Sequence, residues 1–126
     1  MWAIVMIGLG GAAGSVLRYL LSLGATRWLG TTLPWGTLAA NVIGSFALGV
    51  LMELSGERRI AGVQARLVLG TGVLGGFTTY SSFNLETLRL FEQGAVVRGG
   101  AYLFATVLVC MLAGFAGIAL ARALKG

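Results

Sequence analysis

Charged residues are scarce in this sequence. Only 10% of its 126 residues are Asp, Glu, Lys or Arg, whereas 57% are hydrophobic, and the mean hydropathy is +0.91. A soluble domain carries about 25% charged and about 45–50% apolar residues, so this chain has too little polar surface to face water. We therefore expect one domain, over residues 1–126, that lies in a lipid bilayer.

Residue types that common chemistry requires are also missing. The absence of histidine excludes a histidine proton relay or metal centre, and the single cysteine, Cys110, cannot form an intramolecular disulfide. The apolar runs contain no pair of carboxylates, no cysteine–histidine pair and no phosphate-binding motif. The sequence therefore gives no support for an enzyme or for catalytic residues.

The net charge of +5 arises from nine basic and four acidic residues, and the basic residues lie mostly at the ends of apolar segments. Such positions are typical of anchors at the level of the lipid headgroups, and we expect no nucleic-acid partner. The N-terminal MWAIVMIGLGG has no charged region before its apolar run. We interpret it as a retained membrane segment and not as a cleaved signal peptide.

Charged residues divide the sequence into four uncharged runs, at residues 1–17, 28–52, 67–85 and 99–121. Each run is close to the ~20 mostly apolar residues that a helix needs to span a bilayer. The sequence thus predicts an all-α membrane protein with four spanning helices and with both termini on one side. Turn and charge signals place the loops near residues 24–34, 53–64 and 91–98.

Basic residues are divided almost evenly between the two sides of this arrangement. One side carries Arg58, Arg59, Arg66, Arg122 and Lys125, and the other carries Arg27, Arg89, Arg98 and, at its edge, Arg18. The positive-inside rule therefore favours cytoplasmic termini only slightly. A small protein with so weak a bias can be expected to insert in both orientations.

Glycine is the commonest packing signal, with 21 residues. Small residues lie four apart in three pairs: Gly10 and Gly14, Gly72 and Gly76, and Ala113 and Gly117. Such spacing lets membrane helices approach closely. Simple packing explains any one pair, and together the pairs predict a compact bundle.

Polar residues in or directly after the first two runs carry a free-energy cost unless they are paired. Arg18, one turn after Gly14, is either a headgroup anchor or a cation that attracts anions at the mouth of an aqueous vestibule. Thr37, Asn41 and Ser45 form a stripe at four-residue spacing. This stripe either holds helices together by hydrogen bonds or lines a polar pathway, and Asn41 matters most because its amide needs several partners.

The third run contains GGFTTYSSFN, residues 75–84, which is unusually polar for a spanning segment. Non-helical backbone at membrane depth is tolerated only where it is buried in protein or lines a cavity. If the helix breaks here, free carbonyl oxygens over residues 75–78 favour a hard cation such as Na⁺, and the start of the next half-helix favours an anion. The alternative is an unbroken helix whose hydroxyls bond to its own carbonyls.

Two aromatic residues and an acid follow this polar patch. Tyr80 and Phe83 share a helix face, and such pairs ordinarily pack, but the positive edges of aromatic rings also favour an anion in a dry pore. Glu86 lies one turn beyond Phe83. It either pairs with Arg89 or contributes to an ion path.

Three classes of membrane protein fit these features to different degrees. A proton-coupled exporter of the small multidrug resistance type is the main alternative, but it depends on a glutamate in its first helix, and the first run has no acid. A structural or holin-like subunit would not need the hydrogen-bond donors around Asn41 and residues 78–82. Such donors suit a small, strongly hydrated anion, and four short helices favour a pathway between subunits.

Three segments resemble a known family. GTLAANVIGSFALG at residues 36–49 and GVLGGFTTYSSFNLET at residues 72–87 resemble signature segments of the Fluc (CrcB) fluoride-channel family, and GGAAGSVLRY at residues 10–19 is similar too. The resemblance implies a fluoride-selective channel of the cell membrane that lets cytoplasmic fluoride leave passively and relieves its toxicity. It also implies an antiparallel, dual-topology homodimer with two fluoride pathways along the subunit interface and a structural Na⁺ at its centre.

The resemblance also implies roles for individual residues. The backbone carbonyls of Gly75 and Thr78 match those that hold the Na⁺ at the break in the third helix. Asn41 matches the pore asparagine, and Thr37 matches a hydroxyl nearer the vestibule, where Arg18 is the cation.

The remaining matches extend the fluoride pathway. Phe83 matches the second member of a paired-phenylalanine box, and Tyr102 matches an aromatic hydroxyl on the fourth helix. Three residues match a polar track that continues from the box: Ser81, Ser82 and Glu86.

Three features depart from the family pattern. Tyr80 occupies the first box position in place of phenylalanine, and Asn84 replaces the serine or threonine that follows Phe83. On the fourth helix, Cys110 and Gly114 stand where relatives carry further hydroxyls. Because of these departures, the resemblance does not say which residues make the inner contacts of the polar track with fluoride.

Overall fold

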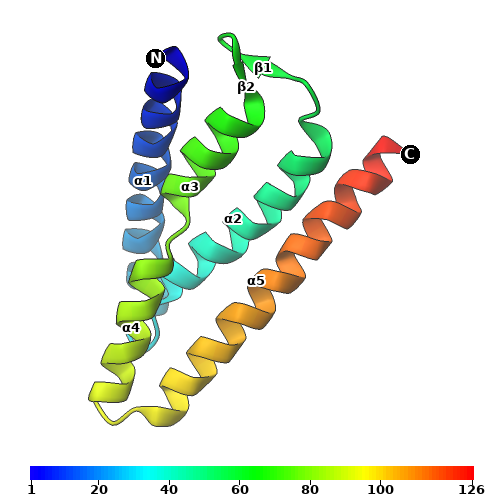
Figure 1. The fold of residues 1–126 in the computed structure, drawn as a ribbon. Helices are drawn as coiled ribbons and strands as arrows, with labels where there is room; N and C mark the ends of the chain where they lie inside the picture. The colour runs from blue at the N-terminus through cyan, green and yellow to red at the C-terminus, as the bar shows by residue number, and fades with distance from the viewer.

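The computed structural model describes residues 1–126, which are almost entirely helical. In chain order the helices are α1 (Trp2–Leu29), α2 (Trp35–Leu54), the π-helical η1 (Arg66–Leu74), α3 (Gly75–Phe77), α4 (Tyr80–Glu92) and α5 (Val96–Lys125). The expected all-α composition has one exception, an antiparallel hairpin of β1 (Arg59–Ile60) and β2 (Val63–Gln64) between α2 and η1. Both termini lie toward the same end of the molecule (Figure 1).

Three helices, α1, α2 and α5, are long and apolar enough to cross a membrane. Many of their large apolar side chains point outward, and none of the large side chains in the chain is fully buried. A soluble monomer rarely exposes such extensive apolar surface, so the exposed faces are suited to lipid or to a partner. The fourth expected span corresponds to η1, α3 and α4, which the chain interrupts at Thr78 and Thr79.

Helix α1 is longer than the sequence predicts. The sequence predicts an apolar run that ends at residue 17, before Arg18, and a loop from residue 24, but α1 continues to Leu29. Arg18 does not end the helix, because its guanidinium finds a hydrogen-bond partner within the protein. The connection to α2 is therefore only residues 30–34.

The hairpin lies within the loop expected at residues 53–64. Its turn has two central residues with positive φ, Ala61 at 50° and Gly62 at 82°, as a two-residue type I′ turn requires. The indole nitrogen of Trp2 donates to the carbonyl of Ala61 at 2.9 Å. This bond fixes the hairpin against the start of α1.

Glycines allow the helices to pack at close range. A Cβ atom at Gly10 would lie 2.8 Å from the carbonyl oxygen of Val68, and one at Gly14 would collide with the backbone of Val73. Helix α1 therefore packs along η1 and α3 with almost no side chain between them. The predicted pair Gly10 and Gly14 is confirmed as a helix contact.

The second pair of closely packed helices is α2 and α5, which run side by side across the molecule (Figure 1). A Cβ at Gly49 would lie 2.5 Å from the carbonyl oxygen of Gly114, and Gly117 sits against the backbone of Phe46. Where α4 meets these two helices, Phe83, Leu90 and Tyr102 form the buried apolar core. This junction positions the polar residues described next.

Candidate functional site

The chain leaves helical geometry at Thr78 and Thr79, between α3 and α4. Thr78 has φ −84° and ψ 159°, and Thr79 has φ −153° and ψ 122°, so both are extended. The hydroxyl of Thr79 accepts the N–H of Ser82 at 3.1 Å and caps the start of α4. The predicted break is therefore present, and the alternative of an unbroken helix is wrong.

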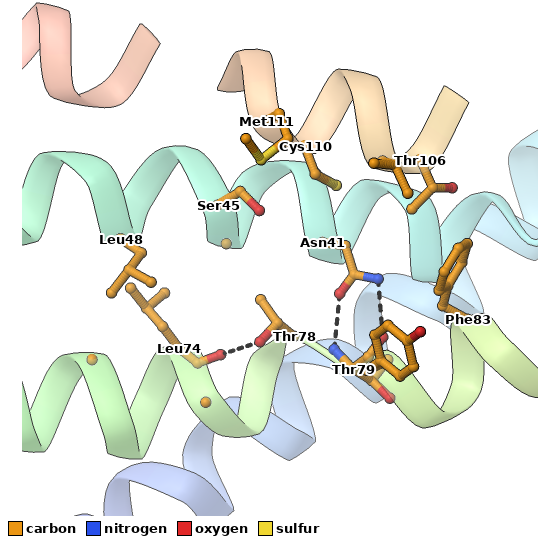
Figure 2. Close-up of a pocket in the computed structure, with 15 residues that line it drawn as sticks. Asn41, Ser45, Leu48, Leu74, Thr78, Thr79, Phe83, Thr106, Cys110 and Met111 are labelled. Atoms are coloured by element: carbon orange, nitrogen blue, oxygen red, sulfur yellow. Dashed lines mark hydrogen bonds between the residues drawn. The ribbon is translucent and has the colours of Figure 1, made fainter. Parts of the chain in front are cut away.

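Asn41 of α2 binds the extended segment between α3 and α4 through both the nitrogen and the oxygen of its amide. Its Nδ2 donates to the carbonyl of Thr79 at 3.0 Å, and its Oδ1 accepts the N–H of Thr79 at 2.8 Å (Figure 2). The amide oxygen thus replaces the helical acceptor that the Thr79 N–H loses at the break, and the amide nitrogen adds a donor to the carbonyl of this N-cap residue. One Nδ2 hydrogen remains available, so Asn41 can both join two elements and offer a donor.

Arg18 of α1 also compensates for the break. Its Nε donates to the carbonyl of Gly76 at 3.2 Å. In a continuous helix this carbonyl would accept the N–H of Tyr80, which the break removes. The positive charge that follows the first apolar run therefore lies against the break and is partly buried.

Two carbonyls beside the break lose their regular helical donors. The N–H of Thr79, which would serve the carbonyl of Gly75, points to Asn41, and the N–H of Ser82, which would serve that of Thr78, points to the Thr79 hydroxyl. Backbone carbonyls released in this way are suitable ligands for Na⁺. The backbone at the expected Na⁺ position therefore offers carbonyl oxygens of the kind that Na⁺ prefers as ligands.

A partly buried polar cluster joins α2, α4 and α5. The carboxylate of Glu86 accepts the hydroxyl of Thr37 at 2.9 Å through Oε1 and that of Tyr102 at 2.9 Å through Oε2. Thr37 and Tyr102 are 6% and 3% exposed. Glu86 forms no ion pair with Arg89, so the first of its two expected roles is wrong.

Aromatic rings connect this cluster to the break. Phe83 is buried, and its ring centroid lies 5.4 Å from that of Tyr102. Tyr80 meets Phe83 edge to face at 5.8 Å, with 73° between the ring planes, but Tyr80 itself is 78% exposed. The two members of the box therefore differ, because one is part of the core and the other faces outward.

Ser81 and Ser82 lie on the first turn of α4, away from the Glu86 cluster. The Ser81 hydroxyl is exposed and lies 3.3 Å from the Thr79 hydroxyl, and the Ser82 hydroxyl makes no hydrogen bond within the chain. The structure thus brings together Thr37, Phe83, Glu86 and Tyr102, but it leaves the two serines at the break.

A cavity of about 450 Å³ opens beside the break. Its lining includes residues that the sequence singles out: Asn41, Ser45, Gly75, Thr78, Tyr80, Phe83 and Cys110. Helix α5 forms the opposite wall, where Figure 2 shows Thr106, Cys110 and Met111. The cavity is therefore largely apolar, with a few hydrogen-bonding groups at its edges.

Thr106 is a lining residue that the sequence interpretation missed. It is 5% exposed, and its Oγ1 has no hydrogen-bond partner. An unpaired buried hydroxyl is unfavourable, which marks this position as one that a ligand can satisfy. The signal was available, because Tyr102, Thr106 and Cys110 are four residues apart and share one face of α5.

Comparison with known proteins agrees with this arrangement. The family described as CrcB-like protein, Camphor Resistance (CrcB), matches residues 5–118. The chain belongs to the CrcB-like family. As a CrcB-like protein with three helices suited to crossing a membrane, it is a multi-pass membrane protein, and the resemblance seen in the sequence is confirmed.

Individual relatives match almost end to end. A protein of Rhizobium etli named "Fluoride-specific ion channel FluC" is 51% identical over 120 residues, which cover 95% of this CrcB-like chain and 96% of the relative. A protein with the same name from Sorangium cellulosum is 51% identical over 118 residues, which cover 94% of this chain and 93% of the relative. Another from Anaeromyxobacter dehalogenans is 50% identical over 123 residues, which cover 98% of each chain.

Proposed function

We propose that this protein is a fluoride-selective channel of the cell membrane that lets cytoplasmic fluoride leave the cell passively and so relieves fluoride toxicity. The observation that carries the proposal is the identity of about half of all positions with fluoride-specific channels over nearly the whole chain. The protein is thus an ion channel and not an enzyme.

The proposed pathway runs from the break toward the Glu86 cluster. Fluoride is small and strongly hydrated, so a protein must replace its lost water with hydrogen-bond donors. The available donors are the second Nδ2 hydrogen of Asn41, the unpaired hydroxyl of Thr106 and the positive edge of Phe83. All three residues line the cavity beside the break.

Beyond Phe83 the proposed pathway reaches hydroxyls that already donate to an acid. Thr37 and Tyr102 each have one hydroxyl hydrogen, and both hydrogens point to Glu86. Fluoride at this level must therefore replace the carboxylate as their acceptor. We infer that Glu86 holds these hydroxyls in place until the ion takes the hydrogen bond.

Arg18, Ser81 and Ser82 complete the proposed path near the break. The guanidinium of Arg18 has donors left over after its single bond to Gly76, and it supplies the positive charge that attracts anions to the vestibule. The Ser82 hydroxyl makes no hydrogen bond within the chain and can turn toward a passing ion, whereas the Ser81 hydroxyl must first leave the Thr79 hydroxyl at 3.3 Å. Tyr80 forms the outward wall through its ring.

We further propose that four spanning segments, the fourth made of η1, α3 and α4, form one domain that assembles as an antiparallel, dual-topology homodimer. The cavity is open on the protomer and the Tyr80 ring is largely exposed, so a second copy would complete the wall. The released carbonyls of Gly75 and Thr78 would hold Na⁺ at the dimer centre. The ion supplies positive charge that stabilises carbonyl oxygens facing one another.

Growth in fluoride tests the physiological part of the proposal. A bacterial strain that lacks its own fluoride exporter should regain growth in fluoride-containing medium when it expresses this protein. A matched strain that expresses the protein with Asn41→Asp should not recover, because a negative charge beside the break repels the anion. No recovery with the wild-type protein, at confirmed membrane expression, contradicts the proposal.

A further inference from the structure

A second cavity, of about 640 Å³, lies between α2 and η1 beside the hairpin, and the fluoride pathway does not use it. Its walls are apolar and come from Phe46, Val50 and Leu54 on α2 and from Leu69 and Val73 on η1. Residues at four-residue spacing lie along one side of a helix. The α2 wall therefore forms a hydrophobic groove roughly 12 Å long, parallel to the helix axis.

The hairpin end of this groove is polar and basic. Ser55, Arg58 and Arg59 line it, and Ser55 is only 3% exposed although its Oγ has no hydrogen-bond partner. The Arg58 side chain makes no hydrogen bond or ion pair in the chain, whereas Arg59 donates to the carbonyl of Gly62 at 2.8 Å. Two donors, one a buried hydroxyl and one a free guanidinium, are therefore available where the groove ends.

The local electrostatics favour an anion at this end. The N-terminus of η1 begins next to the lining residue Ala65, and helix N-termini carry partial positive charge. Glu57 is the only acid of the loop, and it is exposed. The more distant Glu53 is already paired with Arg122 and Lys125.

We propose that this groove binds an anionic phospholipid, with one acyl chain along α2 and η1 and with the phosphate at Ser55 and Arg58. An amphiphile with one negative end matches an apolar groove with one basic end, and a guanidinium and a hydroxyl are good phosphate donors. A soluble phosphate would leave the apolar walls uncovered.

A second copy of the chain is a poorer occupant of the groove, on grounds of charge. The end of the protein that carries the hairpin also carries Arg122 and Lys125, and the other end carries Arg27, Arg89 and Arg98. Basic residues outnumber acidic ones at both ends, so a neighbouring copy in either orientation brings net positive charge toward Arg58 and Arg59. A negative lipid headgroup removes this repulsion.

Native mass spectrometry of the full-length protein tests the proposal. The protein in mild detergent is mixed with equal amounts of phosphatidylglycerol and phosphatidylcholine of identical chains, and the bound lipids are counted. We expect preferential retention of phosphatidylglycerol, with about tenfold weaker binding in the variant Ser55→Ala/Arg58→Gln, which removes a charge-assisted phosphate contact. Arg98→Gln at the opposite end removes the same charge and should not change binding.

Further arms distinguish the other occupants. Arg58→Lys keeps the charge and should retain part of the phosphatidylglycerol binding that Arg58→Gln loses. This comparison separates loss of the charged contact from a general folding defect. Equal loss in Arg58→Gln and Arg98→Gln would show diffuse attraction, and displacement of the lipid by millimolar inorganic phosphate would show a phosphate site; either result overturns the proposal. So does a changed proportion of dimer in Ser55→Ala/Arg58→Gln with lipid binding intact, which would assign the groove to a second copy.

Discussion

Replacing Asn41 with aspartate or alanine separates its two proposed roles. The amide makes two hydrogen bonds to the backbone of Thr79, one as donor at 3.0 Å and one as acceptor at 2.8 Å. Alanine removes both bonds and leaves the N–H of Thr79 without a partner, while the carbonyl of this N-cap residue keeps its bond within α4. The free energy of unfolding should therefore fall by about 1–3 kcal/mol, the cost of one unsatisfied polar group. Aspartate keeps an oxygen that can accept the N–H of Thr79, but it places a second carboxylate oxygen against the Thr79 carbonyl, where the two oxygens repel each other.

The two substitutions should therefore differ in their effects on stability and on conduction. We expect Asn41→Asp to insert into membranes but to abolish fluoride efflux, because its charge lies in the cavity that the anion must cross. Asn41→Ala should lose more stability and retain slow efflux. Denaturant titration in detergent micelles measures the first quantity, and fluoride efflux from liposomes measures the second.

A matched amide-to-acid control is Gln93→Glu, at an exposed position after the end of α4. It adds the same charge outside the proposed pathway and should leave efflux unchanged. Efflux at the wild-type rate in Asn41→Asp would remove Asn41 from the pathway. Unchanged stability in Asn41→Ala would show that the amide does not hold the break.

Three other substitutions test separate parts of the structure. Tyr102→Phe removes a hydroxyl bonded to Glu86 and should slow fluoride efflux about tenfold; an unchanged rate argues against this contact. Thr106→Val removes an unpaired buried hydroxyl, so it should preserve stability in denaturant titration yet slow efflux; lost stability would contradict this. Gly14→Ala should destabilise by about 1–3 kcal/mol, whereas Gly24→Ala, which has open space around it, should not.

The sequence predicts the existence of the three long apolar helices and the position of the break, because both depend on local composition. A scarcity of charge identifies the apolar helices, and glycine next to hydroxyl residues indicates where the third segment loses helical geometry. The cap at Thr79 is likewise local, since its partner Ser82 is three residues away. These features require no knowledge of which helices are neighbours.

The partners of the polar residues could not be predicted in the same way. Arg18 and Gly76 are 58 positions apart, and Thr37 and Glu86 are 49 positions apart. Such contacts depend on how the helices pack, which explains why α1 was expected to end too early and why Arg89 was a plausible partner for Glu86. The hairpin was missed because its strands are two residues each and its turn contains alanine in place of the usual asparagine.

Ion efflux from liposomes tests the central claim most directly. Purified protein is reconstituted into liposomes loaded with equal concentrations of fluoride and chloride, and the release of each ion is followed with selective electrodes without a proton gradient. We predict rapid release of fluoride while chloride is retained. Equal release of both ions, or fluoride release only when a proton gradient is imposed, would contradict a passive fluoride-selective channel.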